Sequence, residues 1–273
     1  RELNKHEIKE IQDNTKADIE VFIHGGMCVS YSGRCTLSNN MTDRDANRGG
    51  CAHSCRWNYD LYDGATKLND ELSFSMSSKD LQTVKQISEL IDIGVHSLKI
   101  EGRMKSIHYI ATVVSTYRKL IDDICDDLEI DLPKYLLEIK KAENRLTSHG
   151  FMEGMTTIDE QLYNMRSENP SQDFIGLVID YNPETFIATI QQRNRFVPGD
   201  YIEVFSPDFE PMKFKVDEII DEEGNSVDAA RHPLQLLKVF IPFKVSKYDM
   251  LRKIKQLSWK NTKIEYNNNC VAR

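Results

Sequence analysis

Hydrophobic positions recur with two different periods along the chain, and the change of period divides it into two parts. In the first part, apolar residues fall at helical spacing over residues 3–14 and 106–124, whereas 19–23 and 95–100 are short apolar runs. These patterns predict two amphipathic helices and two buried strands. Strands that alternate with helices favour parallel pairing with right-handed crossovers, which is an α/β fold.

Between the two buried strands, the pattern predicts three further elements. Two short β-rich runs, 59–62 and 72–76, are expected to be strands. A helix is expected to follow, with Ser77 or Ser78 as its N-terminal cap and Gly94 at its end. The apolar residues at helical spacing that predict it are Leu81, Val84, Ile87, Leu90 and Ile91.

After residue 146 the helical period disappears and turn-forming residues become frequent. Two β-rich runs flank Asn182-Pro183-Glu184, which is typical of a β-hairpin, and more β-rich runs separated by turns follow. We therefore predict an α/β part over residues 1–165 and a small C-terminal antiparallel β-barrel domain over residues 171–273.

Composition indicates a globular protein, with 40% hydrophobic and 29% charged residues among 273. The sequence has no run of 18 apolar residues, and its first residues lack the pattern of a secretory signal. We therefore expect a cytoplasmic protein with no membrane partner. Cytoplasmic thiols are kept reduced, so clustered cysteines in such a protein favour metal or redox chemistry over disulfides.

The formal net charge of -8 conceals an uneven distribution of charge. The stretch 122–131 is strongly acidic and is expected to be a solvated helix end or linker. From Lys238 to Arg273, by contrast, nine Lys or Arg residues stand against Asp249 and Glu265. Such a segment can attract a polyanion, although a merely soluble tail is an equally good interpretation.

Four of the six cysteines, Cys28, Cys35, Cys51 and Cys55, lie close together in the sequence, separated by six, fifteen and three residues. Zinc sites usually have two close pairs of ligands, and this arrangement has one. Iron–sulfur clusters take four thiolates at irregular spacing, so we favour iron–sulfur, with zinc as the alternative. Four inert buried thiols remain the non-functional interpretation. Arginines within this loop, Arg48 among them, can offset the negative charge of such a centre.

A second group of candidate residues directly follows the predicted strand 95–100. Lys99, Arg103 and Lys105 suit a carboxylate or phosphate ligand, and Glu101 can orient Arg103 or act as an acid or base. Ligands of parallel sheets bind beyond the carboxyl ends of the strands, where these residues are expected. A surface ion-pair network at the start of a helix is the alternative.

Several stretches of the chain closely resemble the signature regions of the collagenase-like peptidases of unassigned catalytic type, peptidase family U-32. They are EVFIHGGMCVSYSGRCTLSNNMTDRDANRGGCAHSCRWNYDLYD, GVHSLKIEGRMKSIHYIATVVSTYRKLID, NRLTSHGFMEG, RNRFVPGDYIEV and DAARHPLQ. The resemblance implies a (β/α) TIM-like barrel followed by a small β-domain. Family members usually have a further stretch before the point that matches Arg1, so we expect a partial barrel. Its open edge would be covered by a partner chain or by self-association.

The resemblance also implies chemistry. RNA-modifying members of the family take part in hydroxylating a uridine of tRNA or a cytidine of ribosomal RNA, with prephenate implicated, and related proteins hold a [4Fe-4S] cluster through family cysteines. Carried onto this chain, those ligands are Cys28, Cys35, Cys51 and Cys55. We therefore expect an iron–sulfur-dependent enzyme that hydroxylates the wobble uridine of tRNA with a prephenate-like dicarboxylate.

Expected roles for single residues follow from this interpretation. Arg103, with Lys99 or Lys105, would hold the dicarboxylate, and the basic C-terminal segment would attract tRNA. Arg48 and Tyr31 complete the predicted substrate-binding residues, Tyr31 by stacking on an extruded base.

Two alternatives stay open. Collagenase-like proteolysis would need a cysteine nucleophile partnered by His24 or His53, because the chain has neither Gly-x-Ser-x-Gly nor His-Glu-x-x-His. A lone nucleophile leaves the other clustered thiols unexplained. Glu101 and His24 are accordingly the candidate catalytic residues. The second alternative is a non-catalytic RNA-binding or scaffold subunit.

Overall fold

The computed structural model describes residues 1–68, 74–103, 105–142, 145–162, 173–207 and 210–254. The chain divides into two compact units, Arg1–Ser171 and Gln172–Arg273. Each unit has its own hydrophobic core, so each is described by itself. Among the described residues, no helix is both long enough and apolar enough to cross a membrane.

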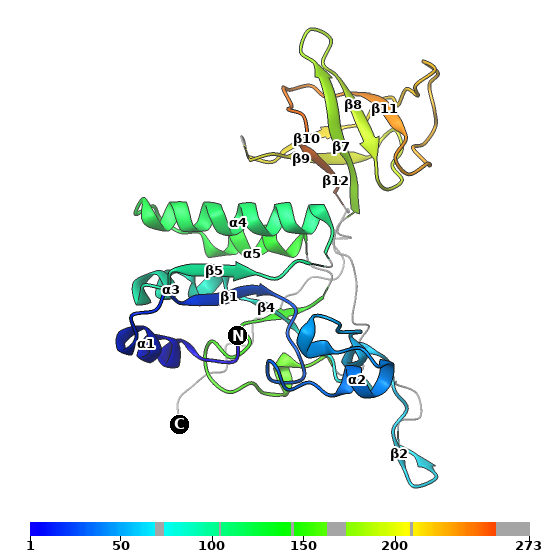
Figure 1. The fold of residues 1–273 in the computed structure, drawn as a ribbon. Coiled ribbons are helices and arrows are strands. Elements are labelled where there is room, and N and C mark those ends of the chain that lie inside the picture. The colour runs from blue at the N-terminus through cyan, green and yellow to red at the C-terminus, as the bar shows by residue number, and fades with distance from the viewer. Residues whose placement is uncertain (69–73, 104, 143–144, 163–172, 208–209, 255–273) are drawn as a thin grey trace, which may run out of the picture. The chain divides into compact units, whose positions relative to one another are not determined.

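The first unit contains the helices and a small mixed sheet (Figure 1). Its helices are α1 (Lys5–Asn14), α2 (Leu37–Thr42), α3 (Ile87–Ile93), α4 (Ile107–Cys125) and α5 (Leu132–Lys140). Its strands are β1 (Glu20–Gly25), β2 (Tyr62–Asp63), β3 (Thr66–Lys67), β4 (Asp80–Gln82), β5 (Ser97–Ile100) and β6 (Thr147–Ser148). Short 3-10 turns are η1 (Ala46–Arg48), η2 (Ser54–Arg56), η3 (Val84–Gln86) and η4 (Ile158–Glu160).

The main sheet of this unit has the strand order β5-β1-β4-β6. Strand β5 runs parallel to β1, and α4 and α5 lie over one face of the sheet (Figure 1). Helix α4 begins where the side chain of Ser106 accepts a hydrogen bond from the Tyr109 backbone, and α3 ends at Gly94, whose φ of 83° suits glycine. The predicted helices and strands at 3–14, 19–23, 95–100 and 106–124 are therefore confirmed, give or take a few residues at their ends.

The predicted helix beginning at Ser77 or Ser78 is wrong in its first half. Strand β4 occupies that place, with Leu81 opposite Gly25 of β1 in antiparallel register. Leu81 and Val84 are still 2% and 1% exposed, because a strand followed by a 3-10 turn buries them as well as a helix would. The helical spacing of the apolar residues is thus overridden by the pairing of β4 with β1. Helix α3 begins only at Ile87.

The structure also corrects the expected all-parallel arrangement. Strand β4 is antiparallel to β1 and parallel to β6, so the sheet is mixed. The described strands do not confirm a TIM-like barrel, since they form a sheet of four strands with β5 and β6 at its edges. The coarser prediction of a mixed α/β unit is confirmed.

The predicted strand 59–62 forms only in part. Strands β2 and β3 pair as a two-stranded hairpin around Gly64, and Tyr59 forms an isolated antiparallel bridge with Phe74. Of the predicted strand 72–76, residues 72 and 73 lie outside the described part of the chain, and the rest contains only this bridge.

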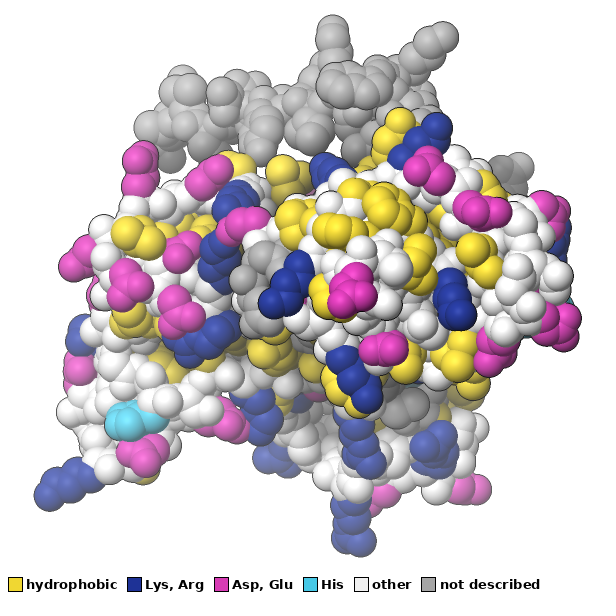
Figure 2. All heavy atoms as spheres, turned by 90° about the horizontal axis from the view of Figure 1, so that it is seen from above, with side chains coloured by type: hydrophobic (Ala, Val, Ile, Leu, Met, Phe, Trp, Pro, Cys, Tyr) yellow, Lys and Arg dark blue, Asp and Glu magenta, His cyan; other side chains and the backbone are white. Residues whose placement is uncertain are grey.

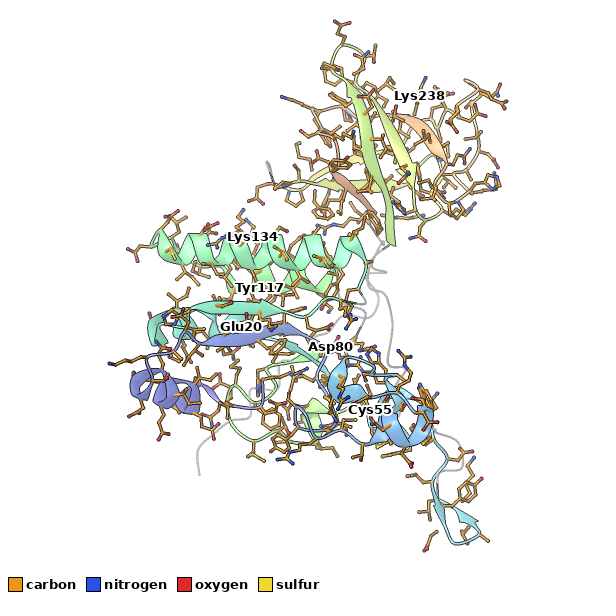
Figure 3. All side chains as sticks on the ribbon, viewed as in Figure 1. Glu20, Cys55, Asp80, Tyr117, Lys134 and Lys238 are labelled. Carbon is orange, nitrogen blue, oxygen red and sulfur yellow. The ribbon has the colours of Figure 1, made fainter. Side chains whose placement is uncertain are left out.

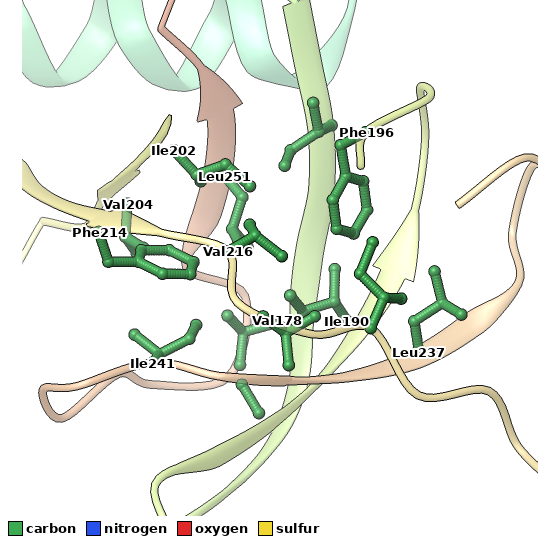
Figure 4. Close-up of a cluster of buried hydrophobic side chains, with 14 of the residues drawn as sticks. Val178, Ile190, Phe196, Ile202, Val204, Phe214, Val216, Leu237, Ile241 and Leu251 are labelled. Carbon is green, nitrogen blue, oxygen red and sulfur yellow. The ribbon is translucent and has the colours of Figure 1, made fainter. Parts of the chain in front are cut away.

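The second unit is an antiparallel sheet, as its β-rich pattern predicts. Its strands are β7 (Asp173–Asn182), β8 (Ile187–Gln192), β9 (Tyr201–Phe205), β10 (Met212–Lys215), β11 (Leu236–Phe240) and β12 (Met250–Lys253), in the order β10-β9-β12-β7-β8-β11. The sheet curls into a half-barrel around side chains such as Val178, Ile190, Phe196 and Leu251 (Figure 4). Asn182 forms the predicted hairpin turn, since its side chain accepts hydrogen bonds from the Glu184 and Thr185 backbones.

The basic segment from Lys238 to Arg273 is only partly described, because residues 255–273 lie outside the described part. Within the described part, the fully buried Arg252 pairs with Glu203, with Nη2 2.5 Å from Oε1. Lys253 pairs with Asp200, with Nζ 2.8 Å from Oδ2. These two cations serve ion pairs inside the unit. Figure 2 shows basic side chains interspersed with acidic ones over the visible face, so that face lacks a uniformly positive surface.

Candidate functional site

The end of β1 brings the two candidate motifs together. Gly25 has a φ of 125°, and a Cβ added there would lie 2.6 Å from the carbonyl oxygen of Glu101. The Glu101 backbone N–H in turn donates to the carbonyl of His24 at 2.9 Å. Only glycine fits this close approach, and the loop that carries the cysteines starts directly after it. The cysteine loop and the stretch 99–105 therefore start from one point.

All four clustered cysteines line a single cavity of about 530 Å³. None of them forms a disulfide: Cys28 and Cys51 are exposed, whereas Cys35 and Cys55 are half-buried. Figure 3 labels Cys55 and Asp80 in this part of the unit. The other residues that line the cavity are Arg1, Gly26, Met27, Ser30, Tyr31, Ser32, Gly33, Ala46, Asn47, His53, Arg56, Glu101, Lys105 and Arg145.

Backbone amides face several of the thiols. The N–H of Ser30 donates to Cys28 Sγ at 3.4 Å, and that of His53 donates to Cys51 Sγ at 3.3 Å. Burial raises the pKa of the Cys55 thiol, Arg56 lowers it, and Cys28 raises it as a neighbouring potential negative charge. The net effect on Cys55 is a raised pKa, so burial disfavours its thiolate, whereas the backbone N–H groups of Ser30 and His53 favour the thiolates of Cys28 and Cys51.

Asn47 fixes the backbone that carries Cys35. Its side chain accepts from the Cys35 N–H at 3.2 Å and donates to the Cys35 carbonyl at 3.0 Å. Asp45 holds Asn47 in place, since its side chain accepts from the Asn47 N–H at 3.0 Å. Gly50 closes the turn, because a Cβ there would lie 2.8 Å from the Asp45 carbonyl oxygen.

The four thiols line one cavity without converging on one point. Thiolates that share a zinc ion each lie about 2.3 Å from it. The part of the chain that the structure describes has no group of three or more His, Cys, Asp or Glu side chains that could hold one metal ion. Four thiols are the donor set that an iron–sulfur cluster takes.

Asp80 organises the positive charge beside the thiols. Its carboxylate is 5% exposed and lies 3.2 Å from Lys105, 3.3 Å from Arg145 and 3.9 Å from Arg56. All three cations line the cavity, and Arg56 also donates to the carbonyl of Met27 at 3.1 Å. Glu101 is the only acidic residue among the described lining residues. The cavity thus suits an anionic ligand.

The predicted substrate-binding residues are not all in one place. Lys105 and Tyr31 line the cavity. Arg103 is not among the lining residues, and its Nη1 lies near Gly49 of the cysteine loop, since a Cβ on Gly49 would be 3.2 Å from it. The other two lie elsewhere. Lys99 pairs with Glu20 and stands over the Phe22 ring, and Arg48 is 87% exposed and pairs with Asp45 at 3.2 Å.

The two candidate catalytic residues differ sharply in environment. Glu101 lines the cavity, and its carboxylate accepts from the Arg103 backbone N–H at 3.2 Å. His24 is 1% exposed and outside the lining, with Nδ1 3.3 Å from the Tyr117 hydroxyl. Burial lowers the pKa of His24 to about 3, and nearby Lys105 adds to this effect. His24 is therefore neutral at physiological pH.

Tyr31 also borders a second, smaller cavity. This cavity of about 210 Å³ is lined partly by Tyr31, Phe151 and Met155, and it shares Cys28 with the first. The Tyr31 and Phe151 rings are 6.3 Å apart between centroids, and Tyr31 is 59% exposed. An exposed aromatic ring beside the cysteine loop offers a surface on which a flat ligand can stack.

Sequence reasoning missed Asp80, Arg145 and Asn47. Asp80 lies in the stretch predicted as a helix. An acidic residue near a helix N-terminus is common, because it interacts favourably with the helix dipole, so it did not indicate a site. Arg145 lies within NRLTSHGFMEG, one of the stretches that carry the family resemblance, and that position was the available signal. Asn47 carried no signal, because its role depends on loop geometry.

Comparison with protein families settles which family this is. The family model described as "Peptidase family U32" matches residues 1–162, and "Peptidase family U32 C-terminal domain" matches residues 170–252. The chain belongs to peptidase family U32. The resemblance carried by the signature stretches is therefore confirmed.

Relatives within family U32 carry two kinds of name. The tRNA hydroxylation protein P1 of Bacillus subtilis is 48% identical over 93% of this chain and 62% of its own length. The 23S rRNA 5-hydroxycytidine C2501 synthase of Escherichia coli is 42% identical over 56% of this chain and 22% of its own. A collagenase of Porphyromonas gingivalis is 31% identical over 74% of this chain and 56% of its own length. The chain thus spans less than two thirds of the length of each relative.

Proposed function

We propose that this chain belongs to an RNA hydroxylase that holds an iron–sulfur cluster, [4Fe-4S] in type, through Cys28, Cys35, Cys51 and Cys55. The observation that supports this most is that all four thiols line one cavity, next to a group of buried cations. The names of the tRNA- and rRNA-modifying relatives point in the same direction. Such a cluster supplies electron transfer or a binding point for a co-substrate.

The cations around Asp80 would hold the small co-substrate. A dicarboxylate such as prephenate carries two negative charges, and Lys105, Arg145 and Arg56 present positive charge to the cavity. Asp80 keeps these side chains in place at 5% exposure. Arg103 lies next to Gly49 outside the lining, and Lys99 is paired with Glu20 away from the cavity.

The remaining residues of the cavity have roles toward the RNA. Tyr31 offers an exposed ring on which an extruded base, such as the wobble uridine of tRNA, would stack. Glu101 is the carboxylate positioned to take or give a proton at the lining. RNA binding would thus depend on stacking at the cavity as well as on charge, in a cytoplasmic protein.

Anaerobic preparation of the protein tests this function. We expect the wild type and Cys125→Ser to be brown and to contain about four irons and four sulfides per chain, because Cys125 lies at the end of α4 outside the cavity. Cys51→Ser should lose the colour and most of the iron. Cells that lack the protein should lack the corresponding hydroxylated nucleoside in their tRNA. A colourless wild type, or normal hydroxylation in such cells, contradicts the proposal.

Proteolysis is the second candidate, favoured by one feature of the cavity. His53 lines it together with Cys51 and Cys55, the two cysteines on either side of it in the sequence. A thiol–imidazole pair of this kind could act as a nucleophile and base, as the name of the collagenase relative suggests. Cleavage of gelatin by the iron-free protein, lost in His53→Gln, would favour this candidate over the hydroxylase.

A further inference from the structure

The smaller of the two cavities is lined mainly by apolar and aromatic side chains. It has a volume of about 210 Å³, and Val29, Tyr31, Phe151 and Met155 are in its lining. Val29, Tyr31 and Met155 are exposed, and Phe151 is half-buried. Apolar side chains that gather around a hollow at the surface mark a binding site more often than scattered ones do. We refer to this hollow as the aromatic cavity.

The charges in the lining of the aromatic cavity balance. Its charged lining residues are Arg1 and Glu2, one cation and one anion. The larger cavity, by contrast, is lined by three arginines and a lysine, with Glu101 as the one carboxylate among them in the described part of the chain. An anionic ligand is therefore expected in the larger cavity, and an uncharged one in the aromatic cavity.

Two of the lining rings are spaced for a flat ligand. The centroids of the Tyr31 and Phe151 rings are 6.3 Å apart, and the ring planes differ by 34°. A flat ring held between two others needs them about 7 Å apart, which is twice the 3.4 Å spacing of stacked bases. The exposed Tyr31 side chain can rotate readily, so a shift of less than about 1 Å admits such a ligand.

The volume of the aromatic cavity limits the size of that ligand. Pockets for drug-sized ligands have about 300–1,000 Å³, and 210 Å³ is below this range. One flat ring fits that space better than two fused rings do. The hydroxyls of Ser30 and Thr156 also line the cavity and can bond to polar groups at the edge of the ring.

The aromatic cavity adjoins the larger one. Cys28, Ser30 and Tyr31 line both of them. A ring held between Tyr31 and Phe151 therefore lies next to whatever occupies the larger cavity. This adjacency is what a reaction between a held base and a separately held co-substrate requires.

We propose that the aromatic cavity receives one extruded pyrimidine base of the RNA, held between Tyr31 and Phe151, and excludes purines by size. This inference rests on the proposed function, since it takes RNA as the substrate. It makes Phe151 a substrate-binding residue, and it makes the cavity the part of the chain that selects the base. Enzymes that act on an extruded base read it in this way, by stacking and by hydrogen bonds to its edge.

Binding of RNA hairpins by the intact chain, prepared anaerobically, tests the inference. Three fluorescein-labelled hairpins differ at one loop position, which carries uridine, adenosine or an abasic site. Tyr31→Leu and Phe151→Leu remove the two rings, and Phe151→Tyr keeps one. The matched control is Tyr62→Leu, because Tyr62 is also 59% exposed but lies in β2, outside both cavities. Fluorescence anisotropy measures each affinity, and thermal unfolding shows that each variant is folded.

The wild type, Phe151→Tyr and Tyr62→Leu are expected to bind the uridine hairpin about 5- to 100-fold more tightly than the abasic one, as stacking on aromatic side chains gives. The adenosine hairpin should bind no better than the abasic one. Tyr31→Leu and Phe151→Leu should bind all three hairpins within about twofold of one another, because the remaining ring cannot hold the base from both sides. If Phe151→Leu does not fold, Tyr31→Leu decides.

Three results overturn the inference. They are equal wild-type affinity for the uridine and abasic hairpins, equal affinity for uridine and adenosine, and unchanged discrimination in folded Tyr31→Leu and Phe151→Leu. Displacement of the hairpin by N-acetylphenylalanine amide but not by uridine would assign the cavity to a protein side chain and overturn it as well. Iron content and the hydroxylated nucleoside in cells test the proposed function separately, so that function can stand when the base site fails.

Discussion

Asp80 is the residue on which the charged side of the cavity depends. It is 3% exposed as a whole residue and faces Lys105, Arg145 and Arg56. Buried cations are tolerated only beside a compensating carboxylate, so one residue controls the placement of three others.

Replacement of that carboxylate gives the first prediction. Asp80→Asn is expected to lower the free energy of unfolding by about 3–5 kcal/mol, because it leaves buried cations without their counter-charge. Urea unfolding measures this. The matched control is Asp13→Asn, which breaks an exposed pair with Lys9 and should cost less than about 0.5 kcal/mol. Equal stability of the two variants would show that the pairs around Asp80 contribute little.

His24 gives a prediction about pH. Its pKa in the folded protein is about 3, below the ordinary value of 6.5, because the imidazole is buried. The unfolded chain therefore binds a proton first as pH falls, and stability present above pH 6.5 is lost below it. Between pH 7 and pH 5 this one group should cost about 2 kcal/mol.

His24→Gln isolates this effect, since the amide can still bond to the Tyr117 hydroxyl. Urea unfolding at both pH values is expected to show a loss about 2 kcal/mol smaller for the variant than for the wild type. Identical pH dependence in the two proteins would mean that His24 already titrates normally in the folded state.

At the scale of elements, the end of β1 decides how the site is assembled. Gly25 lets β1 pass within contact distance of Glu101, and the cysteine loop leaves from this point. The helices, by comparison, are secured by local signals such as the Ser106 cap. The strand end therefore tolerates less change than the helix ends do.

Two glycine substitutions compare these elements. Gly25→Ala places a methyl group 2.6 Å from a backbone oxygen and should cost more than about 3 kcal/mol, with loss of iron uptake. Gly94→Ala, at the end of α3, has its nearest neighbour 3.9 Å away and should cost only about 1 kcal/mol from its positive φ. Thermal unfolding and iron content measure both, and similar losses would contradict the importance of the β1 end.

At the scale of the whole molecule, the two units have separate cores. One core is built around β1, α3 and α4, and the other lies inside the half-barrel of the second unit. The candidate cavity is lined entirely by residues of the first unit. Damage to the second core should therefore leave the cavity intact.

Ile190→Ala tests this separation. Ile190 is fully buried in the half-barrel, so its truncation should lower the stability of the second unit by about 2–5 kcal/mol. Calorimetry is expected to show one unfolding transition shifted and the other unchanged, with iron uptake as in the wild type. A single transition that shifts as a whole would mean that the units unfold together.

Local patterns in the chain are enough to predict the main helices and strands, whereas the family is predicted from the resemblance of the signature stretches. Periodic apolar residues fix α1, α4, β1 and β5 because these elements bury one face each, and this requirement is local. The clustered cysteines likewise indicate a site by their spacing alone. The spacing of apolar residues could not distinguish a strand from a helix at Leu81, because Leu81 would be buried in either one.

Which charged and polar groups share the site depends instead on tertiary packing. Asp80, Lys105 and Arg145 are far apart in sequence and meet because β4 pairs with β1 and β6. The same packing buries His24 beside Tyr117 and leaves Lys99 with Glu20, away from the cavity. Ionic and hydrogen-bonding partners are set by distances in space, which a linear pattern does not contain.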